Sequence, residues 1–139
     1  MKLGLALAAA SGFGLAFAAL PASAHHAVQA SVDIDKKVEM TVVLDRVDWI
    51  NPHTWMHFKT TDAAGKTKNF AVESLGINAL KQAGIDSKSA FHVGEPYKIA
   101  FYPNRDGTLG GFMYKMILPD GRVMDVTNAD PAFAGKPTN

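Results

Sequence analysis

The chain lacks cysteine altogether and lacks a surplus of charge of either sign. Without cysteine there are no disulfides, thiolate metal ligands or thiol nucleophiles, so the fold must depend on core packing or on a bound partner. The 14 Lys and Arg residues nearly balance the 13 Asp and Glu residues. Nucleic-acid-binding proteins normally carry a basic excess or a basic stripe, so we expect no nucleic-acid partner.

Signatures of catalysis are missing as well. The sequence contains neither a Gly-x-Ser-x-Gly elbow nor a glycine-rich phosphate loop followed by Lys and Ser or Thr. Glu73 could act as an acid or base, but it is equally well explained as a strand residue or as a cap of the helix that follows. The methionines are scattered through expected strands, which indicates core filling and not a copper(I) site. We therefore expect a protein that is not an enzyme.

Long apolar runs are confined to the amino terminus. Lys2 is followed by an uncharged run, residues 3–20, and then by Pro21 and the small residues Ala22-Ser23-Ala24. This is the layout of a secretory signal peptide, and an uncleaved anchor is the alternative. We expect cleavage after Ala24, a periplasmic or secreted protein, and no membrane attachment thereafter. Cleavage also removes Lys2, which leaves 115 residues with 13 basic and 13 acidic side chains, a length that suits one domain.

The remaining chain shows strand patterns around one short helix. Apolar residues alternate over residues 37–49 and change parity near Asp45 and Arg46, which predicts a β-bulge. Gly84 is expected to end a helix at residues 76–84. Further strands are expected at residues 54–61, 67–74, 95–102, 111–118 and 122–126. This order predicts an all-β fold with one short helix, an OB-like barrel of five to six strands. A sandwich or roll with the helix on one face is the alternative.

These patterns divide the chain into four parts. Residues 1–24 form the signal peptide, residues 25–36 a flexible amino-terminal segment, and residues 37–126 the OB-like barrel domain. Residues 127–139 are rich in Pro, Gly, Ala and Asn, and we expect them to be a disordered tail.

Several short motifs extend over most of the chain. They are Ala24-His25-His26, Trp49-Ile50-Asn51-Pro52-His53 followed by Trp55, Glu73 ahead of Asn78-Ala79-Leu80, Val93-Gly94-Glu95, Tyr102-Pro103, Asp106-Gly107 and Leu118-Pro119-Asp120-Gly121. In this combination the chain resembles a family of small exported bacterial proteins, the domain of unknown function 6152. It departs from the family pattern at Ala27, Val28 and Ile85. The resemblance implies a barrel and implies no activity, because the family is itself uncharacterised.

Histidines near the new amino terminus raise a metal-binding hypothesis. If cleavage exposes His25, its α-amine and imidazole could chelate one ion, and His26, His53 or His57 could add another imidazole. His53 and His57 would lie about 13 Å apart on an extended strand at ~3.3 Å per residue, so His53 is preferred. Nitrogen ligands favour copper(II), and we assign His25, His26 and His53 to this hypothetical site. The alternatives are a disordered terminus and a His53 that bonds only to nearby backbone.

Two tryptophans flank the Asn-Pro-His turn and mark a second candidate surface. Trp55 and His57 share one face of the second expected strand. An outward Trp beside a His is typical of a stacking platform for a carbohydrate or peptide, although aromatic residues at strand spacing more often pack in a core. We therefore predict a non-enzymatic binding or interaction module, for a small ligand or a protein partner, with a ligand surface of Trp49, Asn51, Trp55 and His57.

Overall fold

The computed structural model describes residue 28, residues 30–85 and residues 88–127 of the chain. The expected signal peptide, the metal-ligand candidates His25 and His26, and residues 128–139 of the expected tail lie outside these ranges. In the described ranges, no helix combines the length and the apolar character that crossing a membrane requires.

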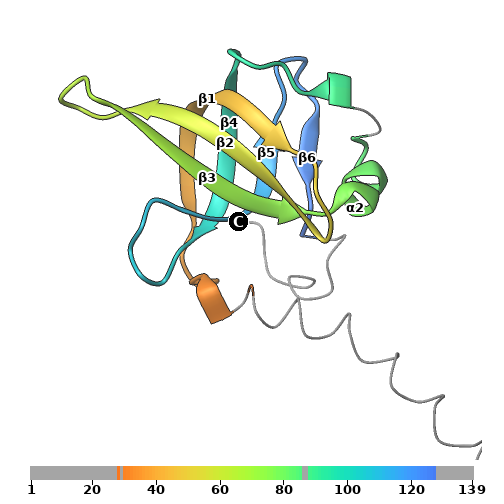
Figure 1. The fold of residues 1–139 in the computed structure, drawn as a ribbon, viewed down its shortest axis with the longest axis horizontal. Coiled ribbons are helices and arrows are strands. Elements are labelled where there is room, and N and C mark those ends of the chain that lie inside the picture. Colours follow the sequence, from red (N-terminus) through yellow and green to blue (C-terminus); the bar gives the residue numbers. More distant parts are fainter. Residues whose placement is uncertain (1–27, 29, 86–87, 128–139) are drawn as a thin grey trace, which may run out of the picture.

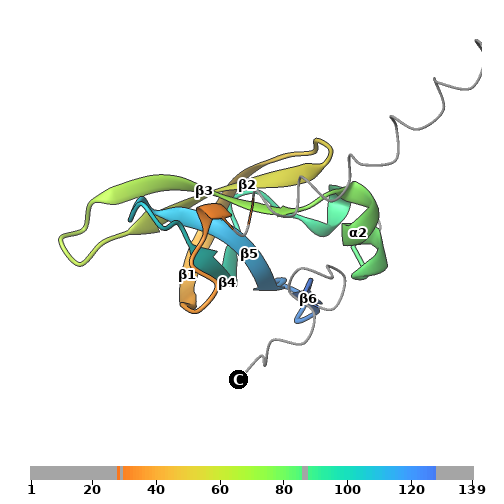
Figure 2. The same ribbon diagram turned by 90° about the horizontal axis from the view of Figure 1, so that it is seen from below.

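The described structure contains six strands and, between the third and the fourth, a short α-helix, as the sequence predicts. In chain order they are β1 (Val38–Asp48), β2 (His53–Thr61), β3 (Thr67–Leu75), α2 (Ile77–Gln82), a 3-10 turn (Lys88–Ala90), β4 (Pro96–Pro103), β5 (Gly110–Ile117) and β6 (Val123–Asp125). The sheet order is β3-β2-β1-β4-β5-β6, and a parallel pairing of β3 with β5 closes the first five strands into a barrel. The predicted fold class, an OB-like barrel with one helix, is therefore confirmed (Figures 1 and 2).

Two consecutive glycines allow the barrel to close. Gly110 and Gly111 pair with Ala71 and Val72 of β3, and both glycines have positive φ angles, of 139° and 150°. A Cβ at Gly111 would lie 1.9 Å from the carbonyl oxygen of Tyr102, and one at Gly110 would lie 2.5 Å from that of Ala71. The backbones of β3, β4 and β5 approach one another so closely here that only residues without a side chain fit.

Strand periodicity fills the barrel interior. Along β2, the alternate residues Thr54, Met56 and Phe58 are fully buried, which is the expected pattern for a strand with one face on a core. Each of the remaining barrel strands, β1, β3, β4 and β5, also contributes large buried side chains to the core. Among them are Leu44, Val72, Ile99, Phe101 and Met113. The short helix α2 adds Leu80 to the same core. Gly84, which has a positive φ of 88°, follows the carboxyl end of this helix.

The described part of the amino-terminal segment packs against the barrel. Val28 and Val32 are buried in the core cluster, and Val32 forms an isolated bridge with Asn104. The segment that we expected to be flexible is therefore held by apolar burial and backbone hydrogen bonds over its described residues. Its two valines lie four residues apart, which places both on one side of a helical turn. Thr127, the first residue of the expected tail, is also buried.

Candidate functional site

A β-bulge in β1 brings charged residues to the outward face of the barrel. Leu44 pairs with Phe58, and Arg46 pairs with His57, so Asp45 is the extra residue between them. The insertion reverses the alternation, and Arg46 and Asp48 point away from the core while Val47 packs against it. The predicted bulge is confirmed, and it supplies the polar residues beside β2.

Two histidines on β2 each make a hydrogen bond with a carboxylate on a neighbouring strand. Nδ1 of His53 bonds to Oε1 of Glu73 on β3. Nε2 of His57 lies 2.8 Å from Oδ2 of Asp48 on β1. The first pair is the more enclosed, with side chains 11% and 20% exposed against 22% and 43% in the second. Each imidazole keeps one ring nitrogen that is not bonded to its carboxylate.

Neighbouring groups fix both pairs further. The ring of His53 meets that of Phe112 edge to face, with centroids 6.2 Å apart. Arg46 Nε lies 3.4 Å from the second carboxylate oxygen of Asp48. The hydrogen bond from His57, followed by the charges of His57 and Arg46, holds the pKa of Asp48 below its usual value. Asp48 is therefore an ionised acceptor at neutral pH, in contact with two donors.

Trp55 lies between the two histidine–carboxylate pairs. Its ladder partners are Asp48 on one side and Glu73 on the other. Trp55 is 37% exposed, whereas its strand neighbours Thr54 and Met56 are fully buried. The structure therefore presents a large aromatic ring to solvent with polar side chains on both sides. Ligand sites commonly combine an aromatic surface with a few well-placed polar groups.

A hollow of about 260 Å³ adjoins His57 on the same face. The ladder partner of His57 on β3 is Ala71, which pairs in turn with Gly110 on β5. These two residues have little or no side chain, so they leave space beside the imidazole. The other lining side chains are polar or aromatic: Asp45, Arg46, Asn69, Phe58 and Phe70.

The remaining predicted surface residues lie at the turn before β2. Asn51 is exposed, and its turn packs closely on Gly76, where a Cβ would lie 2.3 Å from the carbonyl oxygen of Pro52. Trp49 is half-buried, and its ring packs against Phe91 with centroids 5.5 Å apart. Trp55 and His57 thus share an open face, Asn51 lies near its edge, and Trp49 serves packing.

The metal hypothesis has one described member, His53, since His25 and His26 lie outside the described residues. Within the part of the chain that the structure describes, no three His, Cys, Asp or Glu side chains gather as a metal site would need. His57 is directed to Asp48.

Sequence reasoning missed several residues of this face. Arg46, Asp48 and Asn69 were not singled out, and Glu73 was considered without its partner His53. The change of parity at the predicted bulge was the available signal for Arg46 and Asp48, because it implies that both turn outward. The contributions of Asn69 and Glu73 depend on the register of β3 against β2, which the sequence alone does not specify.

We name the outward surface formed by His53, Trp55, His57, Asp48 and Glu73 the Trp55 face.

No curated protein matches the chain. A family model does match it, over residues 12–113, and it describes a family of unknown function, DUF6152. This match covers most of the chain and agrees with the resemblance carried by its motifs. The chain belongs to the DUF6152 family.

Proposed function

We propose that the protein is an exported, non-enzymatic binding module and that its Trp55 face binds a carbohydrate. The observation that carries this proposal is the exposed ring of Trp55 between two histidine–carboxylate pairs. Export is supported by the signal-like layout of residues 1–24. The first residue of the exported protein, measured by mass spectrometry, tests that part independently.

The chemistry of the face suits a sugar. A pyranose ring has an apolar side that can lie on an indole, and it has hydroxyl groups at its rim. Hydroxyls both donate and accept hydrogen bonds, so they match carboxylate oxygens and imidazole nitrogens together. The ionised Asp48 accepts from hydroxyls, and the hollow beside His57 offers Asn69 as a further polar partner.

The location of the face and its charge both favour this ligand. OB-folds bind oligonucleotides and oligosaccharides on the surface of their second and third strands, which here carry Trp55 and Glu73. Asp45, Asp48 and Glu73 would repel the phosphates of a nucleic acid. A neutral oligosaccharide meets no such repulsion. A peptide or partner protein is the competing occupant, because aromatic residues are enriched at interfaces.

Fluorescence provides a direct test. A Trp49→Phe variant leaves Trp55 as the single indole, and maltotriose, cellotriose and chitotriose are then titrated separately to 10 mM. We expect at least one trisaccharide to change the emission of Trp55 with a saturable curve. Trp55→Ala should abolish that binding when followed by calorimetry, and it should destabilise the fold by less than the ~3 kcal/mol typical of a buried Trp. A flat response to all three sugars contradicts the carbohydrate proposal.

Copper(II) binding through His25, His26 and His53 is a second candidate. The hydrogen bond that Nδ1–H of His53 donates to Glu73 favours it, since metal-ligating histidines usually donate their second ring N–H to a carboxylate, a backbone carbonyl or water. Nε2 of His53 would then be the ligand, beside the amine and imidazole of a freed His25.

Its test compares the processed protein with a form that carries one extra Ala before His25. The extension blocks the terminal amine and should weaken copper binding at least tenfold. Equal affinity in both forms, or a Kd weaker than ~1 μM (about −8.2 kcal/mol) in the processed form, contradicts this candidate.

A further inference from the structure

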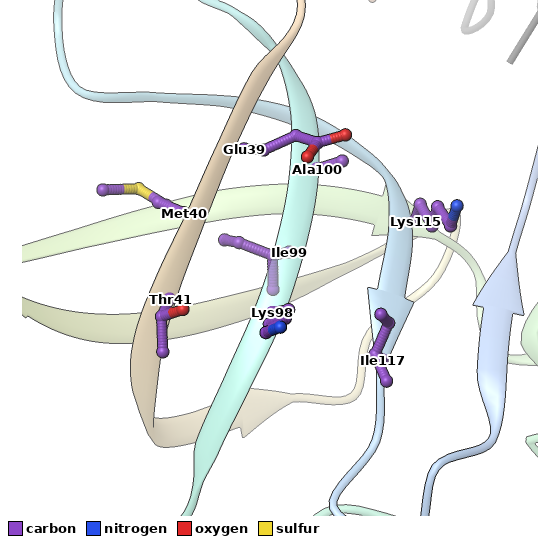
Figure 3. Close-up of a pocket in the computed structure, with 8 residues that line it drawn as sticks. All are labelled: Glu39, Met40, Thr41, Lys98, Ile99, Ala100, Lys115 and Ile117. Carbon is purple, nitrogen blue, oxygen red and sulfur yellow. The ribbon is translucent and has the colours of Figure 1, made fainter. Parts of the chain in front are cut away.

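A second hollow lies on a different side of the barrel, on the outward face of β1, β4 and β5. Its volume is about 330 Å³, near the lower end of the ~300–1,000 Å³ usual for ligand sites, so it suits a small molecule. Its lining includes Glu39 and Thr41 of β1, Lys98 and Ala100 of β4, and Lys115 and Ile117 of β5 (Figure 3). None of these residues belongs to the Trp55 face.

Strand register explains the shape of this hollow. Glu39 pairs with Ala100, and Ala100 pairs with Lys115, so the three form one row across the strands. The methyl group of Ala100 stands between two long side chains and leaves a depression. In Figure 3 the Glu39 side chain reaches from β1 across β4, and its carboxylate lies beside Ala100. The floor is therefore apolar and its two ends carry opposite charges.

A second lysine adds to the positive end. Lys98 lies two residues before Ala100 on β4 and pairs with Ile117 of β5, which makes it the diagonal neighbour of Lys115. Diagonal neighbours on one sheet face are separated by about 7–8 Å, within reach of long side chains that converge on one group. Two ammonium groups and one carboxylate thus surround Ala100.

These three charges are not neutralised within the described structure. Across residues 28, 30–85 and 88–127, Glu39, Lys98 and Lys115 make neither an ion pair nor a side-chain hydrogen bond. Most other acidic side chains of the described chain do have partners, such as Asp45 with Lys59 and Asp120 with Arg122. These three unpaired charges lie together at one hollow.

We propose that this hollow is a binding site for a zwitterionic amino acid with an apolar side chain. Its carboxylate would lie between the ammonium groups of Lys98 and Lys115, and its ammonium group would meet the carboxylate of Glu39. Ile117, which is 36% exposed and lies on the same outward face, supplies an apolar surface for the side chain. A simple anion would be repelled by Glu39 and a simple cation by the two lysines, so only a ligand with both charges satisfies all three groups.

Three probes of similar shape separate the two charges of the ligand. L-leucine carries both, 4-methylpentanoate lacks the ammonium group, and L-leucinamide lacks the carboxylate. Each is titrated to 20 mM into the ¹⁵N-labelled protein at pH 7 and followed by amide chemical shifts. We expect saturable shifts with L-leucine at Thr41, Ala100 and Lys115, binding at least tenfold weaker for the other two probes, and no shift of the Trp55 indole signal.

Charge-removing variants of the lining residues assign the roles. Lys98→Gln and Lys115→Gln should each weaken L-leucine binding at least fivefold. Glu39→Gln should weaken L-leucine binding but strengthen 4-methylpentanoate binding, because it removes a repulsion. Lys66→Gln, in the exposed β2–β3 loop, removes the same charge elsewhere and should change neither. All four sites are exposed or partly exposed, and thermal unfolding of each variant verifies that it is folded.

The outcomes are distinct from those for the Trp55 face. Equal binding of L-leucine and 4-methylpentanoate, with no effect of Glu39→Gln, would show a plain anion site and overturn the proposal. Absence of shifts with L-leucine at 20 mM would overturn it as well. Trp55→Ala should leave L-leucine binding unchanged, so failure of the carbohydrate proposal has no bearing on this one.

Discussion

The Trp55 face differs in the arrangement of its charges from the second hollow, the one lined by Glu39, Lys98 and Lys115, which we call the Lys98 hollow. On the Trp55 face, His53 and His57 are already bonded to carboxylates of the protein. In the Lys98 hollow, one carboxylate and two ammonium groups face a depression with no partner in the described structure. Groups that are already paired add little net charge attraction, so a ligand of the Trp55 face would be held mainly by the aromatic ring. Unpaired groups would instead select a ligand by its charges.

The largest expected effect is a loss of folding stability that would disrupt the Trp55 face and the Lys98 hollow together. Gly111→Ala places a Cβ against the carbonyl oxygen of Tyr102 at a φ of 150°, so we expect a loss of roughly 3 kcal/mol or more in the free energy of unfolding. Gly121→Ala is the matched control, since it also has a positive φ but open space around it, and should cost about 1 kcal/mol. Urea denaturation measures both. Similar losses in the two variants would show that the contact with Tyr102 does not hold the barrel closed.

A smaller effect distinguishes the two pairs of the Trp55 face. Glu73→Ala leaves the enclosed imidazole of His53 without its hydrogen-bond partner, and we expect a loss of roughly 1–3 kcal/mol. Asp48→Ala removes the partner of the more open His57, where water can replace it, and should have a much smaller effect. Urea denaturation at pH 7 compares the two variants with the unaltered protein. Equal destabilisation would mean that both pairs are equally shielded from solvent.

The smallest effect concerns acid titration of the open pair. His57→Gln removes the main cause of the low pKa of Asp48, which should therefore rise toward its usual value of 3.8. A carboxyl whose pKa is lower in the folded state stabilises the fold above that usual value, and the contribution disappears as pH falls through the folded pKa. The variant should consequently lose less stability between neutral pH and the region below pH 3.8.

Carboxyl ¹³C shifts measure this change. Asp106, whose low pKa is due to hydrogen bonds from Thr108, is an internal reference that should not move. An unchanged Asp48 midpoint in His57→Gln would assign its low pKa to Arg46 instead.

The strands were predictable because each has its own local signal. Period-two alternation marks β1 and β2, the loop residues 62–66 mark the hairpin between β2 and β3, and Gly84 marks the end of α2. The bulge was predictable for the same reason, since a change of parity is visible within residues 37–49. Val28 and Val32 gave no such signal, because two apolar residues in a short segment establish no period.

The candidate sites were predictable only where one strand contains the information. The outward direction of Trp55 and His57 follows from alternation along β2. The pairing of His53 with Glu73, across twenty residues of sequence, requires the register of two strands. Trp49 stands at a strand end, where alternation no longer tells which side a ring takes, and its packing on Phe91 depends on a distant loop. The row of Glu39, Ala100 and Lys115 joins three strands and has no local signal.

The bulge at Asp45 also has a bearing on how this surface can change in evolution. Loss of that single codon would leave Arg46 directly after Leu44, so regular alternation would keep Arg46 and Asp48 outward and Val47 inward. The strand would lose the local bend and the added twist of the bulge, together with the carboxylate that pairs with Lys59. The polarity of this side of the barrel therefore survives a deletion here, whereas its curvature does not. Related sequences with a gap at this point should accordingly keep the same surface chemistry on a straighter strand.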